Sequence, residues 1–358
     1  MNREIEDFAQ TQEQFWHLCT PGDSSGILFR IKEDYIYGRN IHMNMLDTLK
    51  GSYFSEIVPK GWDIEKIKAC VSNDPATVCD RQDFWNEGFE PVKCTNLEEF
   101  GAYMGFEIAM QIKQTKEEGR KLILILPVGP MGMYKWAVYF LKQLNIDCKH
   151  VYGFNMDEWA DADGNTLPGS DPAAFQNAMT EAFYGPLGEL TVPEDQRNFA
   201  TKENLPTYMS KIEALKAEGA KQVMVYGIGR MCHIAFWEPH FATEYATEEE
   251  WLDAPYRIGA KLHPLTIEQN AITSFRSSWP LIPCFANTIG PKIIFGSDYC
   301  IGGADGVLSR GMQWQGMSFW MTLRHGPTKA ITSSRIPTMP GKLFFMEELA
   351  GPLCPDTN

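Results

Sequence analysis

The chain has 358 residues, of which 44% are hydrophobic and 22% are charged. This length suits two domains or one large domain with additions, and the composition is that of a globular protein with a sizeable core. The formal net charge of −14 disfavours nonspecific nucleic-acid binding, which depends on basic patches that face phosphate. It leaves open an anionic small substrate, because backbone donors can create a local positive site.

The nine cysteines are scattered, and none forms a C-x-x-C pair. This distribution disfavours a disulfide framework and a structural zinc module, and it indicates a reducing compartment. The N-terminal stretch is charged and lacks the apolar core of a secretory signal. No apolar run approaches the ~20 residues that span a bilayer. We therefore expect a cytoplasmic protein that binds neither a membrane nor nucleic acid.

Residues 1–93 differ in pattern from the rest of the chain, because they are rich in aromatic and turn residues. We expect this segment to be an N-terminal extension that packs on a main domain formed by residues 94–358. One or two strands are expected within it, in GILFRIKEDYIYG at 26–38.

From about residue 94 the chain alternates between strand-like and helix-like segments. The stretch at 96–119 has helical spacing of apolar residues and ends at a glycine, whereas KLILILP at 121–127 is typical of a strand buried on both faces. Further helices are predicted at 129–145, 173–187, 205–219 and 314–327. Further strands are predicted at 150–155, 221–229 and 291–298, with short ones at 330–334 and 342–346. This alternation predicts an α/β domain with a mostly parallel sheet.

Three of the predicted strands end in loops of unusual chemistry. These loops are PVGPMG, NMDEW and GIGRMCHIAFWEP, which begin at residues 127, 155 and 227. In open parallel sheets the binding crevice lies outside the carboxyl ends of the strands, so we expect the three loops to meet there.

The order LPVG, FNMDEW and GIGRMCHIAFWEP resembles the glucosamine-6-phosphate deaminase (isomerase) family, whose relatives include 6-phosphogluconolactonases. FNMDEW matches a family FNMDEY, and HIAFWEP matches a family HIAFNEP, which favours the deaminase branch. The resemblance covers about residues 94–350. It implies the family's modified Rossmann-like three-layer sandwich, often as an oligomer, and it implies no organic cofactor and no metal.

The family reaction opens the ring of an amino-sugar phosphate, moves a proton between C1 and C2, and releases ammonia. The resemblance places Asp157 on the general base, His233 on the histidine that assists ring opening, and Glu238 on its partner carboxylate. A buried carboxylate with a raised pKa suits the removal of a weakly acidic proton beside a carbonyl. A histidine suits the ring-opening proton near neutral pH.

The histidine loop departs from the family pattern G-x-G-x-D-G-H. Here it reads GIGRMCH over residues 227–233. Met231 stands where a second carboxylate would flank the histidine, and a thioether neither carries charge nor accepts a strong hydrogen bond. Cys232 replaces a glycine. The loss of a group that orients a catalytic histidine is expected to cost ~10²–10⁴ in rate.

The phosphate side of the pattern departs as well. The family's G-G-T-P or S-G-S-T-P loop is here Gly129-Pro130-Met131-Gly132, in which Pro130 lacks an N–H and Met131 lacks a hydroxyl. Backbone donors near Gly132 and Met133 remain for an anion. The family's two basic residues fall on Gln315 or Gly316 and near Thr273 or Ser274, which leaves Arg257, Lys261 and Arg276 as candidate substitutes.

Several candidates also have a structural interpretation. Asp157 could cap a helix or turn, and Glu158 beside it either contacts substrate or has a structural role. Trp237, which replaces a family asparagine, either stacks on a sugar face or packs in the core. The spacing of Cys232, His233 and His240 matches no ordinary zinc pattern, so no metal is expected.

These observations predict a sugar-phosphate (amino-sugar) isomerase or deaminase with Asp157, His233 and Glu238 as catalytic residues. One alternative is a catalytically impaired sugar-binding or sensor protein, and another is a sugar lactone hydrolase. The expected partner is a small-molecule sugar or sugar phosphate, and a homo-oligomer is an open alternative to a monomer. The candidate substrate-binding residues are Gly129, Gly132, Met133, Glu158, Gly227, Gly229, Met231, Cys232, Trp237, Arg257 and Lys261.

Overall fold

The computed structural model describes residues 45–308 and 312–353 and divides the chain into two units, Met1–Val58 and Pro59–Asn358. The described part of the first unit contains a 3-10 helix, η1 (Met45–Leu49), and one helical turn and a half, α3 (Tyr53–Ile57). The strands expected at 26–38 lie outside the described residues. The sheets and the candidate site belong to the second unit.

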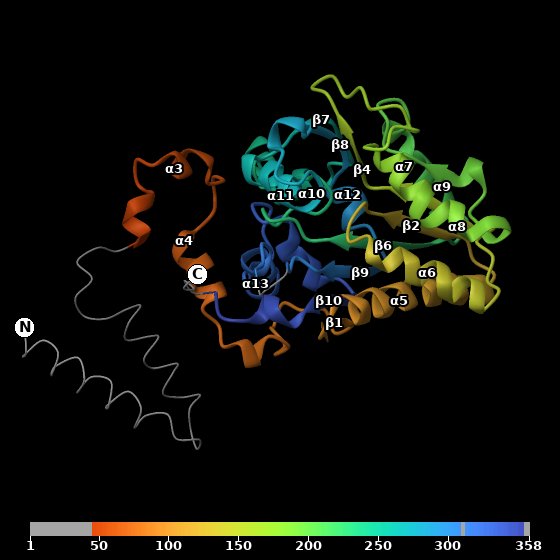
Figure 1. Cartoon of the computed structure of the whole chain (residues 1–358), viewed down its shortest axis with the longest axis horizontal. Helices are drawn as coiled ribbons and strands as arrows, with labels where there is room; N and C mark the ends of the chain where they lie inside the picture. Colours follow the sequence, from red (N-terminus) through yellow and green to blue (C-terminus); the bar gives the residue numbers. More distant parts are fainter. Residues whose placement is uncertain (1–44, 309–311, 354–358) are drawn as a thin grey trace, which may run out of the picture. The chain divides into compact units, whose positions relative to one another are not determined.

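The second unit is built on a seven-stranded sheet in which all neighbouring strands are parallel (Figure 1). The strand order is β1-β10-β9-β6-β2-β3-β5. All five residues of β2 are buried, as a continuous apolar run implies. The predicted parallel α/β sheet is therefore confirmed. Its strands are β1 (Phe89–Cys94), β2 (Leu122–Leu126), β3 (Val151–Asn155), β5 (Arg197–Asn198), β6 (Lys221–Gly227), β9 (Tyr299–Ala304) and β10 (Gly341–Met346).

Helices cover both faces of this sheet. On β3, a side chain at Gly153 would meet the ring of Tyr184, whereas its neighbour Phe154 packs on Tyr208 with ring centroids 5.0 Å apart. Tyr184 and Tyr208 therefore lie on opposite faces, since successive strand residues alternate. This arrangement is the predicted three-layer sandwich. The helices are α5 (Leu97–Glu117), α6 (Gly132–Gln143), α7 (Phe175–Met179), the π-helical turn Thr180–Tyr184, α8 (Gly185–Leu187), α9 (Tyr208–Ala217) and α13 (Gly316–Arg324).

The segment before the sheet is part of the same compact unit. It carries α4 (Ile64–Val71) and the 3-10 turn η2 (Pro75–Thr77). The indole N–H of Trp62 donates to the carbonyl of Ala330 at 2.8 Å, and that of Trp85 donates to Leu323 at 3.1 Å. Strand β1 pairs with β10 along its whole length, so the sheet begins at Phe89, before the expected domain start at residue 94.

A second, three-stranded antiparallel sheet has the order β4-β8-β7. Its strand β4 (Asp157–Ala160) follows β3 after the single residue Met156. The N–H of Met156 donates to Leu126 of the large sheet at 2.9 Å, and its carbonyl accepts the N–H of Ile289 at 2.8 Å, so this residue links the two sheets. The other elements here are β7 (Tyr256–Lys261), β8 (Phe285–Ile289), α10 (Glu248–Leu252) and α11 (Pro264–Ser274).

Two of the predicted strands are wrong. The stretch at 291–298 begins with helix α12 (Pro291–Ile294), because a proline at the first helical position favours a helix start. The strands that surround it are β8 and β9. Residues 330–334 lie at the start of a 3-10 segment, η10 (Thr332–Thr338). In both cases the segment is too short to show a periodicity that separates strand from helix.

The packing of α5 against α6 depends on Gly105 (Figure 1). A Cβ at this position would lie 2.6 Å from the carbonyl oxygen of Met133 and 2.7 Å from the N atom of Ala137. Both are backbone atoms, so the helices themselves would have to move. We expect Gly105→Ala to lower the free energy of unfolding by about 1–3 kcal/mol, measured by urea denaturation. Gly132→Ala, which adds a Cβ into open space, is the matched control, and equal losses would contradict this explanation.

Candidate active site

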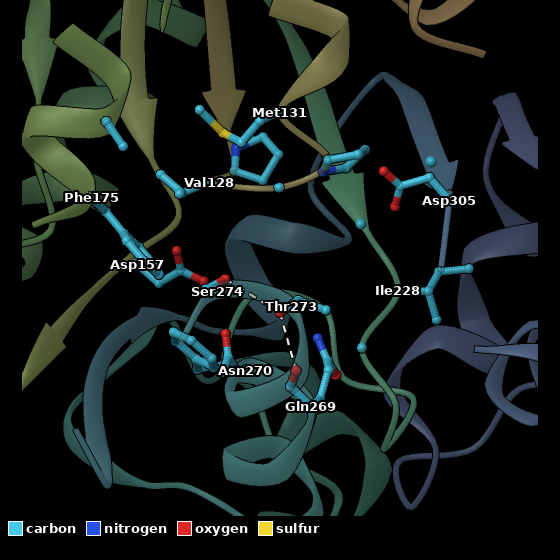
Figure 2. Close-up of a pocket in the computed structure, with 18 of the residues that line it drawn as sticks. Val128, Met131, Asp157, Phe175, Ile228, Gln269, Asn270, Thr273, Ser274 and Asp305 are labelled. Atoms are coloured by element: carbon cyan, nitrogen blue, oxygen red, sulfur yellow. Dashed lines mark hydrogen bonds between the residues drawn. The ribbon is translucent and has the colours of Figure 1, made fainter. Parts of the chain in front are cut away.

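The carboxyl ends of β2, β3, β6 and β9 surround one cavity of about 760 Å³. It lies where the strand order reverses, since β3 follows β2 on one side while β6 and β9 lie on the other. The three loops that were expected to meet do so here, and residues 127–131, 156–157 and 227–229 line the cavity. Helix α11 completes the wall with Gln269, Asn270, Thr273 and Ser274 (Figure 2).

Asp157 is the first residue of β4, and its carboxylate points into the cavity (Figure 2). The residue is 7% exposed. Within the described residues, no hydrogen bond or ion pair holds its carboxylate. Burial, assisted by the charge of neighbouring Glu158, raises the pKa of Asp157 well above its usual range. A carboxyl group so placed can accept a proton and return it.

Glu158 has a different role, because strand alternation turns it away from Asp157. Its Oε1 accepts the backbone N–H groups of Phe175 and Trp159 at 2.8 and 3.0 Å, and its Oε2 accepts that of Gln176 at 2.8 Å. Burial raises the pKa of Glu158, and these donors oppose the shift. The side chain holds the start of α7 and does not line the cavity. This placement fits the structural interpretation of Glu158.

His233 lines the cavity and is backed by Glu238. Its Nδ1 lies 3.4 Å from Oε2 of Glu238 and 3.3 Å from the hydroxyl of Thr266. Glu238 is 1% exposed, and its Oε1 accepts the N–H of His263 at 3.1 Å. Burial raises the pKa of Glu238, but the adjacent His233 and the hydrogen-bond donors outweigh burial and keep its pKa below the usual value. An ionised Glu238 therefore orients the imidazole.

The two unusual residues before His233 are buried outside the cavity. Met231 is 2% exposed, and the sulfur of Cys232 lies 3.7 Å from that of Met321. Cys232 has a φ of +59°, in the left-handed region that a glycine enters without steric cost. The loop thus keeps a glycine-like backbone course while lacking the family's second carboxylate. Glu238 is the one carboxylate paired with His233 in the part of the chain that the structure describes.

The candidate anion loop after β2 presents little polarity. Gly129, Pro130 and Met131 line the cavity, whereas Gly132 and Met133 do not. Met133 is completely buried in the core, and Met131 gives helix α6 no side-chain cap. The backbone donors expected at the start of α6 are therefore not among the cavity-lining groups.

The candidate basic residues do not line the cavity either. Arg257 pairs with Glu244 and lies over the ring of Phe241 at 4.0 Å. Lys261 is exposed at the end of β7, and Arg276 follows α11 with a φ of +49°. Trp237 is completely buried, 5.6 Å from Phe241 between ring centroids, so it packs in the core. Gly227 and Gly229, in contrast, do line the cavity.

Asp305 is a cavity residue that was not among the candidates predicted from the sequence. It follows β9 directly, lines the cavity opposite Asp157, and points into it (Figure 2). Burial raises the pKa of Asp305 to about 6. The strand before it was predicted at 291–298, which hid an aspartate at a strand's carboxyl end. A buried run that ends in GGAD was the available signal.

The described residues also bear on a metal site and on a membrane-spanning helix. Over residues 45–308 and 312–353, no three histidine, cysteine or acidic side chains come together as a metal site would require. No described helix combines the length and the apolar character that a membrane crossing requires.

No protein-family model matches the chain. The chain is 30% identical over 150 residues to glucosamine-6-phosphate deaminase of Parabacteroides distasonis, a match that covers 40% of this chain and 53% of that protein. It is 29% identical over 205 residues to the Caenorhabditis elegans enzyme of the same name, covering 56% and 69%.

One solved structure, that of a monomeric glucosamine-6-phosphate deaminase, has the same fold. Its TM-score is 0.58 at 19% identity, and the match covers 73% of this chain and 98% of that one. The match to the Parabacteroides protein spans about half the length of that relative. Part of the chain is thus similar in sequence to glucosamine-6-phosphate deaminases, and the chain shares its fold with one of them.

Proposed function

We propose that this protein is an isomerase or deaminase of an amino sugar or sugar phosphate, and that it moves a proton between C1 and C2 after ring opening. The observation that carries the proposal is the shared cavity of Asp157 and His233. One is an unpaired buried carboxyl with a raised pKa, and the other is a histidine held by an ionised carboxylate. Glucosamine-6-phosphate deaminases among the relatives support this reaction class.

The chemistry follows from these two groups. His233 gives a proton to the ring oxygen as its bond to C1 breaks and takes the proton of the C1 hydroxyl, so that an aldehyde forms at C1, while Glu238 orients the imidazole. Asp157 then removes the proton at C2, His233 returns a proton to the C1 oxygen, and the electron pair forms an enolamine in an amino sugar or an enediol in a hydroxy sugar. Return of the proton to C1 gives the ketose from the enediol. From the enolamine it gives an imine at C2, which water converts into the ketose and ammonia.

The loss of a second carboxylate beside His233 favours a second candidate function. Met231 is buried outside the cavity and carries no charge. Glu238 is therefore the one described carboxylate beside His233, the residue proposed to assist ring opening. A sugar-binding or sensor protein would keep the cavity with this weaker machinery. An isomerase or deaminase would convert a bound sugar into product, whereas a sensor protein would bind the sugar without converting it.

The test is proton exchange in deuterated water. The full chain is incubated with glucosamine, glucosamine 6-phosphate, glucose and glucose 6-phosphate, and deuterium at C1 and C2 is followed by proton NMR beside an ammonia assay. We expect exchange with at least one sugar, and none with the Asp157→Asn variant. Binding without exchange or ammonia release from any sugar would instead establish a binding protein.

We further propose the cytoplasm as its compartment. The seven cysteines placed within the described residues are all free, and four of the five in the main cavity-bearing region between residues 94 and 300 are buried. Free thiols in such numbers suit a reducing environment.

A further inference from the structure

The charges that line the cavity are unsuited to a phosphate group. Among its described lining residues are two carboxylates, Asp157 and Asp305, and neither lysine nor arginine. His233 is the one lining side chain there that can become cationic. Protein sites for phosphate use arginine, lysine or converging N–H donors, since a dianion needs charge-assisted hydrogen bonds.

Three backbone donors in the loops after β6 and β9 are also occupied. The N–H of Gly229 donates to the carbonyl of His233 at 3.0 Å, and that of Arg230 donates to Oε1 of Gln269 at 2.7 Å. On the neighbouring loop, the N–H of Gly306 donates to Oε1 of Gln315 at 2.8 Å. These internal bonds leave the loops after β6 and β9 without the convergent N–H groups that form an anion-binding nest.

Asp305 lies beside the loop that replaces the family's phosphate loop. A Cβ on Gly303, two residues before it, would lie 2.7 Å from Cγ of Pro130. Gly227 is also close to this loop, since its Cβ would lie 3.1 Å from the carbonyl oxygen of Gly129. The proline ring and a carbonyl oxygen therefore cover the ends of β9 and β6.

The Asp305 carboxylate is available to a ligand. It points into the cavity from the wall opposite Asp157 (Figure 2), and it has no ion pair within the described residues. Burial raises its pKa to about 6, so it is mainly ionised at pH 7.5 and accepts hydrogen bonds. A hydroxyl group of a ligand satisfies such an acceptor, whereas a phosphate dianion is repelled by it.

We propose that Asp305 accepts a hydrogen bond from a substrate hydroxyl, and that the cavity thereby selects an unphosphorylated sugar. The proposal rests on the proposed function for its reacting end, where Asp157 and His233 act on C1 and C2. Asp305 then sets specificity at the opposite end of the same cavity.

The experiment compares glucosamine with glucosamine 6-phosphate, and glucose with glucose 6-phosphate, by exchange kinetics and by titration calorimetry at pH 7.5. We expect the wild-type chain to prefer the unphosphorylated member of a pair by about tenfold or more in kcat/KM and in Kd. Asp305→Asn should raise KM for that sugar about tenfold with a smaller change in kcat. Asp305→Lys should shift the preference toward the phosphate ester. Asp163→Asn, on an exposed turn away from the cavity, is the matched control.

A wild-type preference for the phosphorylated sugars would overturn the inference. Arg310→Ala is assayed in parallel because residues 309–311 lie outside the described residues. A phosphate preference that this variant abolishes would overturn the inference in the same way. If no sugar exchanges, the proposed function fails, and the calorimetric preference still decides the inference. Binding of neither member of either pair would reject both.

Discussion

Asp157→Asn should lower turnover by ~10²–10⁴ while the protein becomes more stable to heat. The loss follows because an amide cannot accept the C2 proton. The gain follows because the folded chain buries a carboxylate that no described hydrogen bond or ion pair compensates. The same residue is thus a source of activity and a cost in stability, as is common at active sites.

The stability gain should depend on pH in a defined direction. The folded state raises the pKa of Asp157, so it binds this proton more tightly than the unfolded chain does. Below an ordinary aspartate pKa of about 4, the group is protonated in both states and costs nothing. As pH rises, burial opposes ionisation, and the wild-type chain loses stability until pH passes the raised pKa.

Thermal unfolding of both proteins from pH 4 to pH 8 measures this effect. The difference in Tm between Asp157→Asn and wild type should widen as pH rises. Asp163→Asn, which changes an exposed carboxylate, should track the wild type. A difference that stays constant across the range would mean that folding does not raise the pKa of Asp157.

Gly229→Ala is expected to displace the imidazole ring of His233 and so to lower turnover. A Cβ at Gly229 would lie 1.9 Å from Nε2 and 2.2 Å from Cε1 of the imidazole, so the ring must move. Movement would break its contacts with Glu238 and Thr266. We expect turnover to fall by about 10² or more, because ring opening needs an oriented proton donor.

A double-mutant cycle tests this explanation. If Gly229→Ala acts by displacing the ring, it should cost little further turnover in a chain that already carries His233→Ala. Independent, additive losses would show that Gly229 affects the site by another route. Binding of the sugar by calorimetry separates a displaced histidine from a blocked cavity, because only the second should abolish binding.

Much of the fold and the meeting of the loops could be predicted from the sequence. Strand β2 is a continuous apolar run and β6 contains one, VMVY, because both strands are buried on both faces. Strand β9 could not be found in the same way. Its sequence YCIGGA contains two glycines, and the more apolar KIIF nearby forms a helix instead. Asp305 was missed because its strand was missed.

The direction of a side chain was harder to predict than its place in the chain. Arg257 was a candidate basic residue of the site, yet it pairs with Glu244 and does not line the cavity. Trp237 stands beside Glu238, yet it packs in the core. Such choices depend on partners that are distant in the sequence, which a local pattern does not contain.

The single residue Met156, which links the two sheets, limits the insertions and deletions that this protein can tolerate. Pairing with β8 sets Asp157 opposite Thr288 and Glu158 opposite Asn287, and so decides which carboxylate enters the cavity. A residue inserted or deleted at Met156 would exchange the two faces of β4, turning Asp157 toward α7 and Glu158 toward the cavity. Length variation among relatives should therefore avoid this link and collect in exposed turns such as 161–165.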